Sequence, residues 1–345
     1  MNIGLGLDTT PGLSFDEEQQ IAREAADLGY TSMWTPEGAG YDSFQLCSLR
    51  WAASHTDTKD GLTTGIGVCP VAYRSPVAFA MSAGTVSAIT GGRFILGIGS
   101  GGIYRPDTRA SLGLPARSTL GVMRDYLTTV GGLLAGETIE HDGEGISMHG
   151  VQLGIRPPQT PVYLGALGPK MLELGGELAD GIVLNWCTPE QIAWSRARVD
   201  AGSATAGKAA GTVQLAEYIR VCIDDDVAAA RLSYARSALG YALGMSVPTE
   251  RERAFGYRAH FERMGFTEEL AALDEMRRNG SSYDELVEAV SDDFLLATGY
   301  FGPASGAPEA FARLAQGLDT AIVRVVAVRP GIDAVRAVMR ACAPA

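Results

Sequence analysis

Residues 161–185 of the chain, PVYLGALGPKMLELGGELADGIVLN, contain the unit from which the fold can be deduced. The apolar runs at 161–166 and 180–185 have the length and composition of buried strands. Between them, Pro169 occupies a position where proline commonly begins a helix. A strand, a helix and a second strand in this order predict a βαβ unit, in which the two strands are parallel.

The same alternation continues along the whole chain. Eight strands are predicted, each separated from the next by helical periodicity, at residues 2–7, 31–35, 62–68, 93–98, 161–166, 180–185, 215–223 and 320–328. Eight such units predict an α/β fold of the (β/α)8 TIM-barrel type. Barrels of this type form one domain of about 250 residues or more, so residues 1–345 are predicted to be a single domain.

Two regions interrupt this alternation. Residues 137–160, between the fourth helix and the fifth strand, contain Gly, His and Pro at positions that predict a hairpin or a long loop. Residues 225–300 are largely helical by pattern and rich in charge. They are predicted to be a helical insertion after strand seven, within the single domain.

Composition excludes several classes of function. The formal net charge of −12 argues against a nucleic-acid partner, because phosphate backbones require clustered Lys and Arg. No apolar run approaches the roughly 18 residues of a membrane span, and Met1 leads directly into a strand without a signal-like segment. We therefore expect a cytoplasmic protein with no membrane partner. The five cysteines form no CxxC motif, which argues against a disulfide framework or a metal site.

The active site of such a barrel forms where the strands end. After strand two, Glu37 lies among glycines, and a carboxyl group there could position a cofactor or transfer a proton; a loop residue that caps the next helix is an equal alternative. After strand three, Gly67 interrupts an apolar run in 65–76, which indicates either a bulge close to a ligand or a packing gap. After strand four, the glycine-rich segment 96–102 offers backbone amides and the Ser100 hydroxyl, a weak signal for an anion site.

The loop after strand five carries the strongest site signal. Gly168, Pro169 and Lys170 begin a helix whose free amides and dipole point to the barrel mouth, and the lysine adds a positive charge. This arrangement predicts a phosphate site, although a plain helix start with an exposed lysine is the alternative. After strand six, Asn185 and Trp186 could line a planar cofactor or simply pack at the rim.

None of the four histidines follows a predicted strand directly. A Ser-His-Asp triad is therefore unsupported.

Taken together, four segments resemble the bacterial-luciferase-like flavin oxidoreductases, and among them the branch that uses the deazaflavin coenzyme F420. The matching segments are AADLGYTSMW (25–34), SAITGGRFILGIG (87–99), GALGPK (165–170) and ADGI (179–182). The resemblance extends over nearly the whole chain, and its motifs are specific only in combination.

The resemblance implies a cofactor site at the strand ends. Members of this branch have a non-prolyl cis peptide bond in the bulge that backs the deazaflavin ring, and the matching residues here are Ile66, Gly67 and Val68, followed by Cys69. Asn185 would line the same site. The cofactor phosphate would be bound by Gly165, Ala166, Leu167, Gly168, Pro169 and Lys170, with help from Ser100 and Gly101.

One departure from the family concerns the chemistry. Several members have Asp followed by His in the loop after strand two, whereas this chain has Glu37 followed by Gly38. Without that histidine, oxidation of a sugar-phosphate alcohol is in doubt. The sequence favours the reductive direction, in which reduced F420 donates hydride to an activated C=C or C=N bond, as in an enone, imine or dehydroamino acid. A weak acid or water supplies the proton, and Glu37 is the candidate catalytic residue.

Two alternatives remain open at this point. One is a two-component monooxygenase that uses reduced FMN in place of F420. The other is a barrel that binds a flavin without turnover. For both enzyme hypotheses, F420-dependent and FMN-dependent, the expected partner is a small-molecule or peptide-like substrate. The family resemblance also suggests a homodimer.

Overall fold

The structure is a computed structural model, and it describes residues 1–244 and 253–344. Its centre is a closed barrel of eight parallel strands: β1 (Asn2–Gly6), β2 (Ser32–Thr35), β5 (Thr63–Ile66), β7 (Phe94–Gly99), β10 (Val162–Gly165), β11 (Gly181–Asn185), β12 (Gln214–Ile223) and β14 (Thr320–Val326). Each strand pairs with the next in chain order, and β14 pairs with β1 to close the ring. The predicted TIM barrel and all eight of its strands are confirmed.

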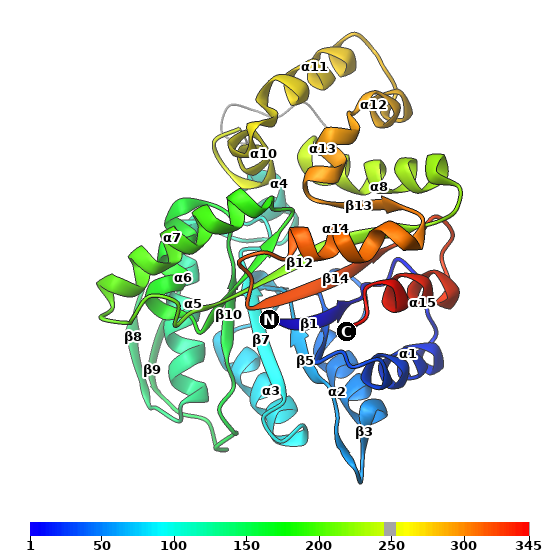
Figure 1. Cartoon of the computed structure of the whole chain (residues 1–345). Coiled ribbons are helices and arrows are strands. Elements are labelled where there is room, and N and C mark those ends of the chain that lie inside the picture. The colour runs from blue at the N-terminus through cyan, green and yellow to red at the C-terminus, as the bar shows by residue number, and fades with distance from the viewer. Residues whose placement is uncertain (245–252, 345) are drawn as a thin grey trace.

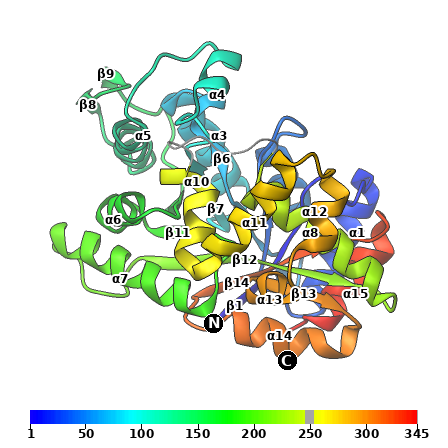
Figure 2. The same cartoon turned by 90° about the horizontal axis from the view of Figure 1, so that it is seen from above.

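Helices surround this barrel, as the view in Figure 2 shows. They are α1 (Phe15–Asp27), α2 (Ser43–Ser54), α3 (Pro76–Ile89), α5 (Thr119–Leu134), α6 (Pro169–Leu178), α7 (Pro189–Thr205), α14 (Ala307–Leu314) and α15 (Ile332–Ala341). Local chemistry defines where they begin. In α1, Ser14 and Glu17 form a reciprocal capping box, and a Ser75 side chain caps α3 directly before Pro76. These caps orient each helix after its strand.

The helical insertion after strand seven is also present (Figure 1). It contains α8 (Val227–Ala242), α10 (Gly256–Phe261), a π-helical turn (Glu262–Phe266), α11 (Thr267–Arg278), α12 (Tyr283–Ala289) and α13 (Asp292–Ala297), and it ends in β13 (Gly299–Gly302), which pairs with the end of β12. The insertion has its own apolar core, which includes Tyr234, Phe261 and Phe294 and reaches Trp186 of the barrel. Residues 245–252 of the predicted insertion lie outside the described residues.

The region 137–160 forms the predicted hairpin, with strands β8 (Ile139–Asp142) and β9 (Ser147–Val151). It packs along α5, where Asp125 accepts hydrogen bonds from the backbone of Gly145 and Ile146 and pairs with His141. The short elements that were not predicted include β13, α4 (Pro106–Ser111), and strands β3 (His55–Thr56) and β4 (Lys59–Asp60), which form a small hairpin.

Buried apolar and aromatic side chains fill the barrel interior below its mouth. They are Trp34, Tyr163, Val183, Ala216, Tyr218 and Ile322, and they form one buried cluster. Side chains alternate between the two faces of a strand. The residue two positions after an interior residue therefore also faces inward, one layer nearer the mouth. This rule places Asn185, Arg220 and Arg324 in the layer above Val183, Tyr218 and Ile322.

Within residues 1–244 and 253–344, no helix has both the length and the apolar character needed to cross a membrane.

Candidate active site

A bulge of the chain enters the barrel mouth after β5. The peptide bond between Gly67 and Val68 is cis, as the family resemblance implies, and the following strand β6 (Cys69–Pro70) pairs with β7. Glycines on the neighbouring strands leave the room for this bulge. A Cβ on Gly97 would lie 2.0 Å from the Ile66 carbonyl oxygen, and one on Gly165 would lie 3.1 Å from a Val68 methyl carbon. The predicted residues from strands three and five therefore meet at one point.

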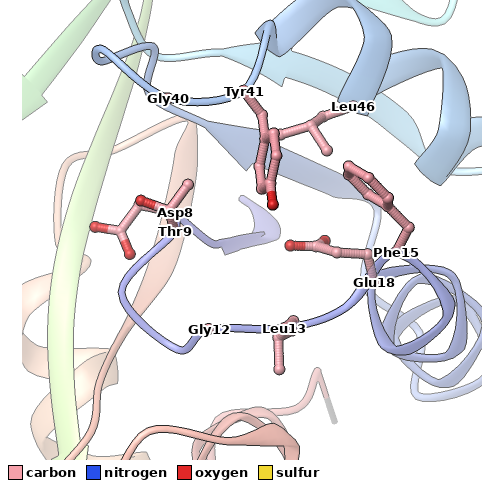
Figure 3. Close-up of a pocket in the computed structure, with 9 residues that line it drawn as sticks. All are labelled: Asp8, Thr9, Gly12, Leu13, Phe15, Glu18, Gly40, Tyr41 and Leu46. Atoms are coloured by element: carbon pink, nitrogen blue, oxygen red, sulfur yellow. The ribbon is translucent and has the colours of Figure 1, made fainter.

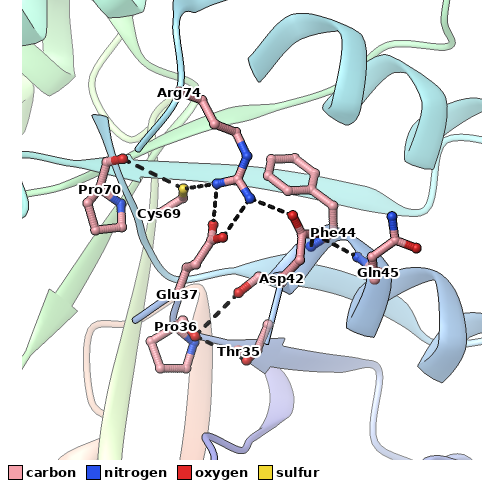
Figure 4. A network of polar contacts seen from close by, with 10 residues as sticks. Thr35, Pro36, Glu37, Asp42, Phe44, Gln45, Cys69, Pro70 and Arg74 are labelled. Atoms are coloured by element: carbon pink, nitrogen blue, oxygen red, sulfur yellow. Dashed lines mark hydrogen bonds and ion pairs between the residues drawn. The ribbon is translucent and has the colours of Figure 1, made fainter. Parts of the chain in front are cut away.

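Glu37 lies beside this bulge, in the loop after β2, and its side chain is almost completely buried. Its backbone N–H donates to the Val68 carbonyl at 3.2 Å. Both carboxylate oxygens accept hydrogen bonds from Arg74, at 2.6 and 2.7 Å, in a bidentate pair (Figure 4). Arg74 also donates to Asp42 at 2.6 Å and to the Cys69 sulfur at 3.1 Å. The loop after β2 is thus fixed against the bulge by one arginine.

This pairing bears on the role of Glu37 as an acid. Burial alone would lower the pKa of Arg74, but its hydrogen bonds to Glu37 and Asp42 raise that pKa, so the guanidinium stays charged. Both carboxylate oxygens of Glu37 are engaged by this guanidinium. Cys69 does not ionise in its place, because burial raises the pKa of its thiol. Catalysis by Glu37 stays a prediction, and the geometry favours a role in holding the loop.

The predicted phosphate loop lies between β10 and α6. Gly168 is the N-cap of α6 and no side chain caps this helix, so its first free amides face the loop. A Cβ on Gly168 would meet no atom within 4 Å, so the space beside this residue is open. Lys170 is exposed in the first turn. A second cation comes from the insertion: Arg263 donates to the Leu167 carbonyl at 3.0 Å.

Ser100 and Gly101 follow β7 on the adjacent side of the mouth. Gly101 has a φ of +56°, and a Cβ there would lie 2.5 Å from Pro70, next to the bulge. Because β7 pairs with β6 on one side and β10 on the other, these two residues lie between the bulge and the β10 loop.

Asn185, at the end of β11, joins the barrel to the insertion. Its Oδ1 accepts a hydrogen bond from Arg220 at 2.6 Å, and its Nδ2 donates to the Tyr257 hydroxyl at 2.6 Å. Arg220 is only 2% exposed and lies 3.8 Å from the centre of the Trp186 ring, a cation–π contact. Burial, and then the charge of Arg324, lower the pKa of Arg220.

Arg220 has no carboxylate partner among the described residues, whereas the adjacent Arg324 pairs with Asp8. Burial opposes ionisation of Asp8, but the charge of Arg324 and hydrogen bonds from Thr10 lower its pKa. The inner mouth therefore carries one positive charge that is not balanced by an acid in contact with it, which favours an anionic or electron-rich ligand.

The luciferase-like monooxygenase family matches residues 2–322. A 5,10-methylenetetrahydromethanopterin reductase of Archaeoglobus fulgidus is 32% identical over 249 residues, which are 72% of this chain and 72% of that one. The chain belongs to the luciferase-like family. Solved structures agree on the fold: the coenzyme F420-dependent tetrahydromethanopterin reductase of Methanopyrus kandleri has a TM-score of 0.75 and 21% identity, covering 99% of this chain and 97% of that one.

A second solved structure extends the likeness of this luciferase-like chain. An F420-dependent secondary alcohol dehydrogenase, in complex with an F420-acetone adduct, has a TM-score of 0.74 and 15% identity. It covers 99% of this chain and 98% of the other. At this identity the likeness concerns the fold.

The luciferase-like barrel also has a pocket of about 330 Å³ beside the mouth (Figure 3). It lies between the loops after β1 and β2, and the Tyr41 ring contacts Phe15 at 5.0 Å between centroids. None of the predicted cofactor residues lines this pocket. Its position indicates a space beside the cofactor site rather than the cofactor site itself.

Behind Trp186, a buried network supports the mouth of this luciferase-like protein. The Trp186 carbonyl is 2.7 Å from His260 Nε2, and burial lowers the pKa of His260 to about 4, so the ring is neutral. Glu217 accepts a hydrogen bond from the Cys187 amide at 2.6 Å, and burial raises the pKa of Glu217 to about 8. No group of three or more metal-ligating side chains occurs among the described residues.

Sequence reasoning missed four residues of this luciferase-like site: Arg74, Arg220, Tyr257 and Arg263. Arg220 had a usable signal, because it is a charged residue in an apolar strand, two positions after inward-facing Tyr218. The other three contact their partners only through the tertiary fold.

Proposed function

We propose that this enzyme is a coenzyme F420-dependent oxidoreductase that transfers hydride between the deazaflavin and an organic substrate. The observation that carries the proposal is the bulge at Gly67 and Val68, backed by glycines and placed beside an uncapped helix N-terminus with two nearby cations. The names of its relatives support the choice of cofactor, since several are F420-dependent oxidoreductases.

The residues present fit this cofactor. The uncapped amides of α6, the open space at Gly168, and Lys170 would hold its phosphate, with Arg263 near the same loop. The Gly67–Val68 bulge would support one face of the deazaflavin ring. When bound, the cofactor supplies the two-electron redox chemistry, and the protein supplies position and electrostatics.

We further propose the reductive direction, with an activated C=C or C=N bond as the acceptor. The similar protein of Archaeoglobus fulgidus is named as a reductase, which supports this direction. Gly38 provides no side chain to act as a base, and Arg74 holds both oxygens of Glu37. The loop after β2 therefore positions the bulge, while the proton for the reduced bond has to come from another group or from water.

Binding of the two cofactors to the purified protein tests the proposal. Fluorescence titration with F420 and, separately, with FMN should give saturable binding of F420 and none of FMN. Oxidation of reduced F420 by a panel of enones, imines and dehydroamino acids then identifies the acceptor. Tight FMN binding without F420 binding would replace the proposal with the flavin monooxygenase, and F420 binding with no acceptor of the panel reduced would contradict the reductive direction.

The remaining expectations stay predictions. They are a small-molecule or peptide-like substrate, a homodimer, and a cytoplasmic location. Size-exclusion chromatography with light scattering would test the homodimer directly.

A further inference from the structure

The orientation of Asn185 is fixed by its two partners. A guanidinium can only donate hydrogen bonds, so the atom of Asn185 that faces Arg220 must be the carbonyl oxygen Oδ1. The amide nitrogen Nδ2 then faces Tyr257 and donates to its hydroxyl oxygen. Since that oxygen accepts from Asn185, the Tyr257 hydrogen must point elsewhere.

No described residue accepts this hydrogen. Tyr257 therefore ends a directed chain that begins at a buried cation: Arg220 donates to Asn185, and Asn185 donates to Tyr257. Successive hydrogen bonds of this kind polarise one another in a low-dielectric interior. Burial raises the pKa of Tyr257, and the hydrogen bond from Asn185 and the charge of Arg220 act in the opposite direction, toward release of its proton.

Tyr257 is also in the right part of the molecule. Its helix, α10, is followed directly by the turn whose Arg263 donates to the Leu167 carbonyl of the phosphate loop. On another side, a Cβ on the preceding Gly256 would lie 2.4 Å from the hydroxyl of Tyr104, in the loop that follows Ser100 and Gly101. The segment that carries Tyr257 therefore contacts the loops after β10 and β7, where the cofactor site is predicted.

We propose that Tyr257 is the catalytic acid of the reductive reaction, and that Asn185 and Arg220 are its positioning residues. The inference rests on the proposed function. Tyr257 would donate the proton, a role for which Gly38 has no side chain and Glu37 is already paired with Arg74.

The reduction adds one hydride and one proton to the substrate. Hydride adds to the carbon of the substrate C=N or C=C bond, and the π electron pair moves to the neighbouring nitrogen or carbon. That atom forms a bond to the Tyr257 hydrogen, and the phenolate left behind regains a proton from water. The proton released when reduced F420 becomes oxidised returns to solvent, so the two hydrogens lost by the cofactor equal the two gained by the substrate.

The main test is Tyr257→Phe, which keeps the ring and removes the acid. We expect kcat to fall by about 100-fold or more, as for loss of a general acid, while the Kd for F420 changes less than about twofold. Tyr234→Phe is the matched control. It removes the same group from a buried tyrosine that packs edge-on against Trp186, and kcat should not change.

A stereochemical measurement separates an acid from a structural residue. With a C=C substrate in D2O, a proton delivered from one fixed side gives a single configuration at the protonated carbon. Tyr257→Phe should give a mixture of configurations, because water then supplies the proton from either side. A residue that merely anchors the insertion would change stability without changing this configuration.

A ligand-free measurement tests the chain itself. In protein labelled with ¹³C at tyrosine Cζ, the resonance lost in Tyr257→Phe is assigned to Tyr257, and Asn185→Leu should shift it while Tyr234→Phe leaves it in place. Wild-type kcat with a single configuration in Tyr257→Phe, or an unshifted resonance in Asn185→Leu, would overturn the inference. Failure of the wild-type protein to bind F420 would overturn the proposed function instead.

Discussion

Gly97→Ala tests whether the bulge depends on the glycines around it. The new methyl group would lie 2.0 Å from the Ile66 carbonyl oxygen, a backbone atom that cannot rotate away as a side chain could. Overpacking of a core usually costs about 1–3 kcal/mol, and a clash with backbone belongs at about the upper end, 3 kcal/mol. With an unfolding entropy of about 2.1 cal/mol/K per residue over 345 residues, this free energy corresponds to a Tm lower by about 4 °C.

Differential scanning calorimetry and F420 titration of the same variant provide the assay. Because Ile66 directly precedes the cis bond at Gly67, the clash should move the bulge and weaken F420 binding together with the fold. The matched control is Gly131→Ala in α5, where a Cβ meets no atom within 4 Å. There, alanine should stabilise the helix by about 0.5–1 kcal/mol. A Gly97→Ala protein with unchanged Tm and unchanged F420 affinity would refute the packing argument.

Three further variants test single groups. Lys170→Ala should weaken F420 binding by about tenfold at unchanged Tm, as expected for one lost charge-assisted hydrogen bond, and an unaltered Kd would remove Lys170 from the phosphate site. Glu37→Gln leaves one N–H of Arg74 without its acceptor, so the free energy of unfolding should fall by about 1–3 kcal/mol, and F420 affinity should fall with it because this pair holds the loop against the bulge. Calorimetry and F420 titration measure the two effects, and unchanged values would contradict the pairing argument. In the folded protein, burial raises the pKa of Glu217 to about 8 from an ordinary 4.5. The free energy of unfolding is therefore highest below pH 4.5, where this carboxyl is protonated in both states, and it falls as pH rises toward 8. Glu217→Gln should flatten that part of the stability–pH curve, and an identical slope in both proteins would contradict the burial argument.

The barrel could be predicted because its strands are buried on both faces. Parallel strands under helices are nearly continuous apolar runs, and 180–185 and 215–223 could be recognised on that basis without any knowledge of pairing. Helix starts were equally local, since the cap of α1 involves residues three apart. The phosphate loop was predicted for the same reason: its signals all lie within residues 165–170.

The polar contacts of the site could not be predicted in this way. Arg74 is 37 positions from Glu37, and Tyr257 is 72 positions from Asn185, so no local pattern connects either pair. The choice of partner also depends on burial, which only the fold determines. Arg74 is the instructive case. Glu37 directly follows a strand, and this was enough to predict that it lies at the mouth. The predicted acid function required a carboxylate without a bidentate partner, and the sequence did not show that Arg74 binds both oxygens.

The barrel and the insertion contribute different parts of the site. The bulge, the glycines and the α6 N-terminus all belong to the barrel, and they are the features that fit a cofactor. The insertion adds the segment 256–266, and its contacts with the barrel include Tyr257 at the end of β11, His260 at Trp186 and Arg263 at the loop after β10. Since the same short segment carries both the proposed acid and a cation near the phosphate loop, its placement fixes the acid relative to the cofactor. On this proposal the insertion completes the site and does not only shape the space for substrate.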